Sequence, residues 1–362
     1  MTKKISVFLI IFFTFSFLIY LQNVKVIKDP KPTHFEKKFV RLKMVKKVSY
    51  DFDDENFIGK VGSVTADKEG NLYIYDSLQA KIFKLNKDLK YIKSFGREGR
   101  GPGEFGNSFS HMELNIGPEN NLYISDSLTH RIHMFDTDGK FIKDYPVKFH
   151  GGFFPIITSL GNFIIPSNNN ETVFTEYTKD MKVKRSVLNA KGSFNKFFYF
   201  KPDYMMLRFL TYPKYFFNYI CKISPDGKKF VVFMINNVTY YLFNNFKLEK
   251  KMRILPKNVL ENYKKYYLED IMKTRESYQP FTRKLFFDLE NSNFLYIQFL
   301  KEMDNLRDVL YRFSLSGVLD EVLYIKLSNN KEYRVFLLEK NSLFYVRDSE
   351  YFYIYKKQGE KK

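Results

Sequence analysis

Cysteine and tryptophan are the scarcest residues of this chain, which has one cysteine, Cys221, and no tryptophan among 362 residues. A single cysteine forms no internal disulfide, and without a cysteine cluster a thiolate zinc site is excluded. Cys221 lies in the apolar stretch 219–223. We therefore expect a buried thiol with no chemical role.

Histidines and catalytic motifs are also few. The sequence has no G-x-S-x-G elbow, no H-E-x-x-H pair and no cofactor fingerprint. Its five histidines are His34, His111, His130, His133 and His150. His130 and His133 lie in one hairpin, where we expect them on the surface. No cofactor and no catalytic residue are predicted, and the sequence favours a protein without catalytic activity.

Acidic residues are outnumbered, 40 against 59 basic ones, which gives a formal charge of +19. Such an excess suits an acidic partner. Only 13 of the basic residues are arginine, however, whereas phosphate and base recognition favours the planar guanidinium. Lys, Asn, Ile, Phe and Tyr are abundant together, as in a compositionally biased genome. A nucleic-acid partner is therefore not predicted.

The N-terminus carries the one long apolar run. Lys3 and Lys4 precede an uncharged stretch of seventeen residues, 5–21. No small-residue cleavage site follows, so residues 1–22 are predicted to form an uncleaved hydrophobic helix that anchors the chain in the cytoplasmic membrane. Secretion after signal cleavage is the alternative. Lysines on both flanks leave the orientation open, and the signal-like beginning favours an extracytoplasmic body. Residues 23–35 are predicted to be a linker.

A repeat dominates the rest of the chain. The segment Asn71–Leu78 recurs as Asn121–Leu128, fifty residues later, and each copy alternates turns with short apolar strands. Weaker copies follow, so that six units lie between residues 61 and 355. We expect an all-β fold, a six-bladed β-propeller over residues 36–358. The stretch 39–45 is predicted to complete the last blade beside residues 351–355, because a ring must cover its final edge.

One segment departs from this pattern. Residues 256–274 predict an amphipathic helix, with Asn258 as the N-cap, Glu261 three positions later and apolar residues spaced every four. The predicted helical insertion, about 256–280, falls between blades four and five. It is interpreted as a cap on the rim of the ring, with a partner-binding helix as the alternative.

The segment Phe95–Phe105 (F-G-R-E-G-R-G-P-G-E-F) resembles the blade-joining loop of NHL-like six-bladed propellers. The flanking N-L-Y-I-x-D-S and R-I-x-x-F strings are similar to the same family, as is a helical insertion before the fifth blade of exported bacterial members. This resemblance implies a platform that binds protein or RNA, an extracellular sensor domain, or a metal-dependent lyase or hydrolase. The loop lacks the G-K-[S/T] ending of a phosphate-binding loop, so phosphate binding is not predicted.

Candidate site residues follow from this arrangement, because one rim of a propeller gathers loops from all blades around a shared pocket. The predicted ligand-binding rim consists of Arg97, Arg100, Glu104, His111, His150 and Arg208. His111, Glu113 and His150 are the candidates for a metal at the channel mouth. Two pairs recur at a spacing of five, Asp76 with Lys81 and Asp126 with Arg131, and predict structural ion pairs around a hairpin turn.

The function hypothesis is a membrane-tethered or exported propeller that serves as a scaffold for a protein, peptide or glycan ligand. Its membrane contact is residues 5–21. A metal-dependent lyase or hydrolase is the alternative, and an RNA-binding platform would require a cytoplasmic ring.

Overall fold

The structure is a computed structural model, and it describes part of the chain. The described residues are 25–27, 39–106, 112–147, 155–166, 172–189, 219–224, 228–234, 239–245, 247–253, 282–287, 291–299, 309–324, 334–339, 343–348 and 350–357. Within these ranges the regular elements are all strands. None of them contains a helix long and apolar enough to cross a membrane.

Short antiparallel strands make up the first two sheets, each in simple up-and-down order. The first consists of β3 (Val61–Ala66), β4 (Leu72–Asp76), β5 (Lys81–Leu85) and β6 (Tyr91–Phe95). The second consists of β7 (Met112–Ile116), β8 (Leu122–Asp126), β9 (Arg131–Phe135) and β10 (Phe141–Pro146). The sequence repeat is thus a structural repeat, because β4 and β8 are its two copies.

The third and fourth sheets follow the same order. The third contains β11 (Ile156–Ile157), β12 (Phe163–Pro166), β13 (Thr172–Tyr177) and β14 (Val183–Asn189). The fourth contains β15 (Tyr219–Ile223), β16 (Lys229–Met234), β17 (Thr239–Asn244) and β18 (Lys247–Arg253). Its outer edge carries one more strand, β1 (Lys25–Ile27), which pairs with β18 in parallel.

The fifth sheet has eight strands in the order β19-β20-β21-β22-β2-β25-β24-β23. Their bounds are β19 (Thr282–Phe287), β20 (Phe294–Phe299), β21 (Val309–Ser314), β22 (Leu319–Tyr324), β2 (Phe39–Ser49), β25 (Tyr351–Lys357), β24 (Leu343–Arg347) and β23 (Arg334–Glu339). Residues 39–41 of β2 pair with β22 in parallel, and residues 42–49 pair with β25 antiparallel. The predicted closure by the N-terminal strand is confirmed.

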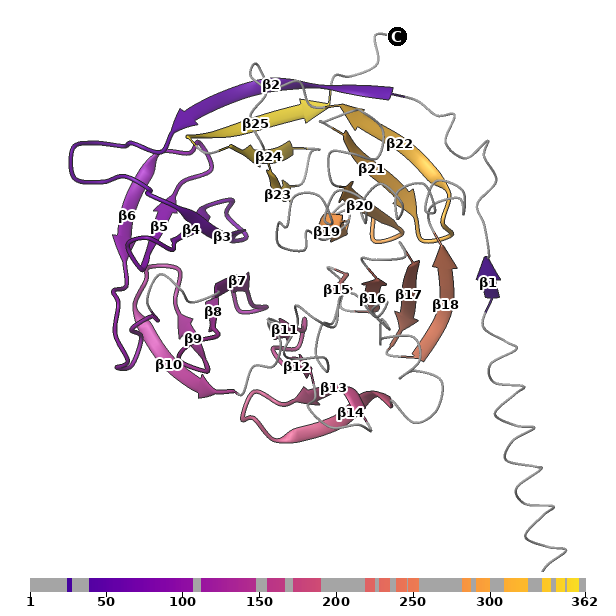
Figure 1. The fold of residues 1–362 in the computed structure, drawn as a ribbon. Coiled ribbons are helices and arrows are strands. Elements are labelled where there is room, and N and C mark those ends of the chain that lie inside the picture. Colours follow the sequence, from indigo (N-terminus) through magenta and orange to yellow (C-terminus); the bar gives the residue numbers. More distant parts are fainter. Residues whose placement is uncertain are drawn as a thin grey trace, which may run out of the picture.

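The sheets surround a common centre as the blades of a propeller (Figure 1). Strands β3, β7, β11, β15, β19 and β23 lie nearest the centre, and β6, β10, β14, β18 and β2 lie outside.

The predicted fold class is wrong in its number of blades. The described strands form five sheets and therefore five blades, where six were expected. The physical reason is β2, which is eleven residues long and hydrogen-bonds to two neighbours, so that two groups of four strands become one sheet. A helix is also absent from the described residues. The predicted N-terminal helix and the helical insertion at 256–280 lie outside those residues.

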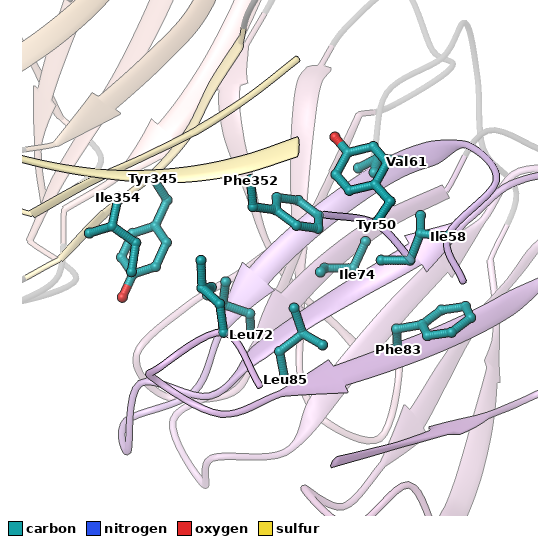
Figure 2. Close-up of a cluster of buried hydrophobic side chains, with 11 residues drawn as sticks. Tyr50, Ile58, Val61, Leu72, Ile74, Phe83, Leu85, Tyr345, Phe352 and Ile354 are labelled. Atoms are coloured by element: carbon teal, nitrogen blue, oxygen red, sulfur yellow. The ribbon is translucent and has the colours of Figure 1, made fainter. Parts of the chain in front are cut away.

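Apolar side chains fill the space between neighbouring sheets. Between the eight-stranded sheet and the first sheet, one buried cluster includes Tyr50, Leu72, Phe83, Tyr345 and Phe352. Figure 2 shows these side chains converging from the two sheets. Burying a side chain of this size stabilises a fold by roughly 1.5–3 kcal/mol. This cluster therefore joins the sheet that contains β2 and β25 to the sheet that begins with β3.

The hairpins owe their tightness to a recurring turn. In the turn 67–71 the Asp67 carboxylate accepts hydrogen bonds from the amides of Glu69 and Asn71, and Gly70 has a φ of 85°. The turn 136–140 repeats this with Asp136 and Gly139. A left-handed residue after a type I turn gives the twist that antiparallel strands need.

Candidate ligand-binding rim

Alternation of up and down strands places two kinds of connection at the same rim. These are the turns that follow β4 and β8, residues 77–80 and 127–130, and the inter-blade loop 96–106 between β6 and β7. Contacts confirm the neighbourhood: the Gly106 amide donates to the Asp126 carboxylate at 2.6 Å, and Arg131 Nη1 donates to the Arg100 carbonyl at 3.0 Å. We call this surface the loop rim.

Backbone hydrogen bonds hold the inter-blade loop in a fixed shape. The Gly99 amide donates to the Phe105 carbonyl at 2.8 Å, and the Phe105 amide donates to the Arg97 carbonyl at 2.9 Å. Gly96 has a φ of 88°, and a Cβ there would lie 2.2 Å from the Phe105 ring. Only glycine combines that backbone angle with so close an approach. Phe105 itself is fully buried and anchors the loop.

The glycines of the loop also make room for a carboxylate. Glu104 accepts hydrogen bonds from the Gly101 amide at 2.8 Å and from Arg97 Nε at 2.8 Å. A Cβ on Gly99 would lie 2.1 Å from Glu104 Oε2. The Gly101 amide and then Arg97 hold the pKa of Glu104 below its ordinary value. The Gly101 amide thus donates to an anion that the loop itself supplies, the Glu104 carboxylate.

Three of the six predicted rim residues lie together on this loop. The Arg97 side chain is 79 % exposed although it pairs with Glu104, and Arg100 is exposed. Glu104 is mostly covered and holds the loop. His111, His150 and Arg208 lie outside the described residues.

Apolar side chains accompany these arginines at the loop rim. Leu78 and Leu128 occupy equivalent places in the two repeat copies, and they are 64 % and 49 % exposed. Each follows an aspartate that caps its turn. Neither leucine was among the residues predicted for the rim, although both recur at the same position of the repeat. The loop rim thus presents two cations and two leucines on backbone that is held in place.

Beneath the loop lies a buried polar cluster that the sequence did not predict. His133 on β9 is fully buried, its Nδ1 lies 2.6 Å from Asp144 Oδ1, and its Nε2 lies 3.8 Å from Asp126 Oδ2. Phe105 packs edge-on against its ring at 5.6 Å. Arg131 extends the cluster by pairing with Asp144 at 3.4 Å. The His133 imidazole has no exposed surface, so a ligand cannot contact it. Phe105 and Gly106 of the loop contact this cluster, and the cluster therefore fastens the loop to the second sheet.

The expected surface position of the two hairpin histidines is therefore half wrong. His130 is exposed, whereas His133 is buried. The reason is the register of the hairpin, which pairs His133 with Asp144 on β10 and supplies a buried partner. A register shift between Phe141 and Lys143 brings Asp144 opposite His133, so the Asp138-Gly139 turn signal alone does not predict the pairing.

The predicted ion pairs around the turns take another form. Asp76 and Lys81 are cross-strand partners, but the Asp76 carboxylate accepts the amides of Gly59, Lys60 and Leu78 at 2.8–3.1 Å. Asp126 likewise accepts the amides of Leu128 and Thr129. The aspartates are structural, as expected, but they cap backbone amides.

Asp348 repeats this contact in the eight-stranded sheet. Its Oδ1 accepts the amides of Glu350 and Tyr351, both at 2.8 Å. A carboxylate that accepts two amides of a following turn fixes that turn. The same device therefore serves three of the five sheets.

Of the predicted metal ligands, only Glu113 lies in the described part of the chain. It is on β7, and its Oε2 lies 3.4 Å from Ser63 Oγ on β3. The described residues contain no group of three His, Cys, Asp or Glu side chains that could hold a metal. His111 and His150 lie outside them, so the predicted cluster stays a prediction.

No family model and no curated protein matches the chain. Solved structures do match. The Bacteroides fragilis protein BF0058, provisionally described as exported, is 11 % identical with a TM-score of 0.56, over 89 % of this chain and 100 % of its own. A DUF4221 family member from Bacteroides vulgatus is 12 % identical with a TM-score of 0.53, over 88 % and 98 %. The fold is a β-propeller.

A third solved structure also matches the chain. The β-propeller domain of Cps50 (Swd1) from Myceliophteria thermophila is 9 % identical with a TM-score of 0.50, over 87 % of this chain and 99 % of its own. Proteins this dissimilar in sequence share the architecture, and function has to be argued from the site.

Proposed function

We propose that the chain is an NHL-like propeller, exported and tethered by residues 5–21, that binds a protein, peptide or glycan at the loop rim. The observation that carries this proposal is that Arg100 and Leu128 are both exposed at the loop rim, and that backbone hydrogen bonds hold the loop which bears Arg100. A binding surface gains affinity when its side chains are already in position, because less conformational freedom is lost on binding. Arginine and exposed apolar groups are typical contributors to such surfaces.

The polar network at the rim supports a binding role over a catalytic one. His133, Asp126 and Asp144 contact one another and the loop. Their hydrogen bonds and contacts hold the loop 96–106 over the second sheet. Among the described residues, the exposed groups at the rim include Arg97, Arg100, Leu78 and Leu128, which are suited to ligand contact.

Affinity capture with the detergent-solubilised full chain tests the proposal. The variant Arg100→Glu with Leu128→Ser should lose the partner that the unmodified chain retains, with affinity lowered about tenfold or more. A matched control, Lys140→Glu with Ile142→Ser, changes one exposed lysine and one exposed isoleucine on the outer strand β10 and its turn. Equal loss in the control, or full retention in the rim variant, would show that the ligand binds elsewhere.

Metal analysis of the purified chain tests the alternative, a metal-dependent lyase or hydrolase. A bound divalent ion in stoichiometric amount, together with a lower melting temperature in chelator, would support that alternative. The scaffold proposal expects a melting temperature that chelator does not change.

A further inference from the structure

The N-terminal strand β1 lies against the outside of the fourth sheet (Figure 1). We infer that this outer edge, formed by β1 and β18, faces the membrane and contacts anionic lipid headgroups. The inference rests on the proposed anchoring by residues 5–21. It concerns how the ring is oriented on the bilayer, which the anchoring alone does not specify.

The first argument is the length of the tether. The apolar run ends at Leu21, and β1 begins at Lys25, with three residues between them. Four Cα steps span at most about 14 Å, since a chain extends by no more than about 3.6 Å per residue. Lys25 pairs with Lys250, and Ile27 pairs with Met252. The fourth sheet must therefore stay within about 14 Å of the place where the apolar run leaves the bilayer.

The second argument is charge. The β18 strand has the sequence K-L-E-K-K-M-R, with four basic residues and one acid, and its partner strand adds Lys25. The Lys250 side chain is 31 % exposed beside the exposed Glu249. The Lys251 ammonium lies 5.4 Å from the centre of the Tyr241 ring. Basic segments next to a membrane anchor are attracted to anionic headgroups.

Neighbouring strands sharpen the assignment to this edge. The next outer strand, β22, carries Asp320 and Glu321, whose charges are met by Arg312 and Lys357. The outer strands β6 and β10 lie on the opposite side of the ring from β18 (Figure 1). A ring held at β1 therefore turns its β10 side away from the bilayer, which makes that side a reference position.

Energy transfer from the ring to labelled lipids tests this orientation. The full chain with Cys221→Ser is inserted into vesicles of phosphatidylcholine and phosphatidylglycerol in equal parts, whose headgroups carry an acceptor dye. A donor dye is attached at Glu249→Cys on β18 or at Lys140→Cys beside β10. We expect transfer from the Glu249 position to exceed transfer from the Lys140 position at least about twofold, given the tether length.

The outcomes separate the orientation from the anchoring. A chain that washes off the vesicles at alkaline pH has no inserted segment, which overturns the anchoring and the orientation together. A chain that resists the wash but shows equal transfer from both positions, or more from Lys140, overturns the orientation while the anchoring stands.

Charge reversal tests the headgroup contact. The variant Lys250→Glu with Lys251→Glu should lower transfer from the Glu249 position about twofold in the anionic vesicles. The matched control, Lys140→Glu with Lys143→Glu, should leave it unchanged. Vesicles of phosphatidylcholine alone should reproduce the lowered transfer without any substitution. Transfer that ignores both the charge reversal and the lipid charge would overturn the contact.

Discussion

A buried hydroxyl without a partner stands out at the residue scale. Among the described residues, the Tyr75 hydroxyl is buried and makes no hydrogen bond. Leaving such a group unpaired costs about 1–3 kcal/mol. Tyr73 lies two residues earlier on the same strand, and its hydroxyl donates to the Thr137 carbonyl at 2.9 Å or to Asp67 at 3.0 Å. The two side chains thus differ in what their hydroxyl groups contribute.

Tyr75→Phe should therefore leave the free energy of unfolding unchanged or raise it by up to about 1 kcal/mol. Tyr73→Phe is the control and should lower it by about 1 kcal/mol, because it removes a satisfied hydrogen bond. Urea unfolding of both variants measures the difference. A clear loss of stability in Tyr75→Phe would mean that its hydroxyl has a partner such as an ordered water.

Glu176 supplies a pH-dependent contribution to stability. Burial raises its pKa, but hydrogen bonds from Asn162, Lys184 and Arg185 outweigh burial and hold the pKa below its ordinary value. A lowered folded-state pKa means that the stabilisation is complete above the ordinary glutamate value. It is lost as the pH falls from that value through the folded pKa.

We accordingly expect the free energy of unfolding to decrease with acidity below the ordinary glutamate pKa, and to decrease less steeply in Glu176→Gln. Urea unfolding at a series of pH values from neutral to acidic measures both slopes. Parallel slopes for the two proteins would assign the acid sensitivity to other carboxylates.

At the scale of elements, β2 joins two groups of four strands into one sheet. It pairs with β22 through residues 39–41 and with β25 through residues 42–49, and Leu42 is buried among residues of both partners. A strand that covers two edges removes two rows of unpaired backbone groups at once.

Removal of β2 should consequently open the ring. We expect a chain lacking residues 1–38 to melt cooperatively, and a chain lacking residues 1–49 to aggregate or to melt at least about 10 °C lower. Circular dichroism melts and light scattering measure both. Equal melting temperatures would show that β22 and β25 close the ring without β2.

The elements also show how far the sequence could predict the fold. The repeat and the closing strand were predictable, because alternating apolar residues and turn residues act locally in Leu72–Asp76 and Leu122–Asp126. The number of sheets was not, because it depends on whether residues 39–41 reach β22, which is a tertiary contact. For the candidate site, the sequence placed Arg97, Arg100 and Glu104 on one loop but not the burial of His133, which needs the Asp144 register.

Charge acts at the scale of the whole molecule. A formal charge of +19 means that basic groups repel one another in the compact state, although local ion pairs such as Arg185 with Glu176 oppose this. Salt screens exposed charges that lie farther apart than the Debye length, about 8–10 Å at physiological strength. Repulsion between basic groups on different parts of the ring acts over distances longer than the Debye length, so salt weakens it strongly. The ion pairs act at contact distances, so salt weakens them less.

Raising sodium chloride from low to moderate concentration should hence raise the melting temperature, by roughly 2–4 °C for each kcal/mol of relieved repulsion. Thermal melts of the full chain in a nonionic detergent measure it. A melting temperature that falls with salt would show that the ion pairs outweigh the general repulsion.

The strand that joins both ends of the ring also sets the order of events during synthesis. Residues 39–49 leave the ribosome early, but their antiparallel partner at 351–357 is nearly the last segment to be made. Until translation ends, this early strand has no complete binding place. An incompletely synthesised chain therefore exposes unpaired backbone groups along residues 42–49, which favours aggregation until residues 351–357 have been made.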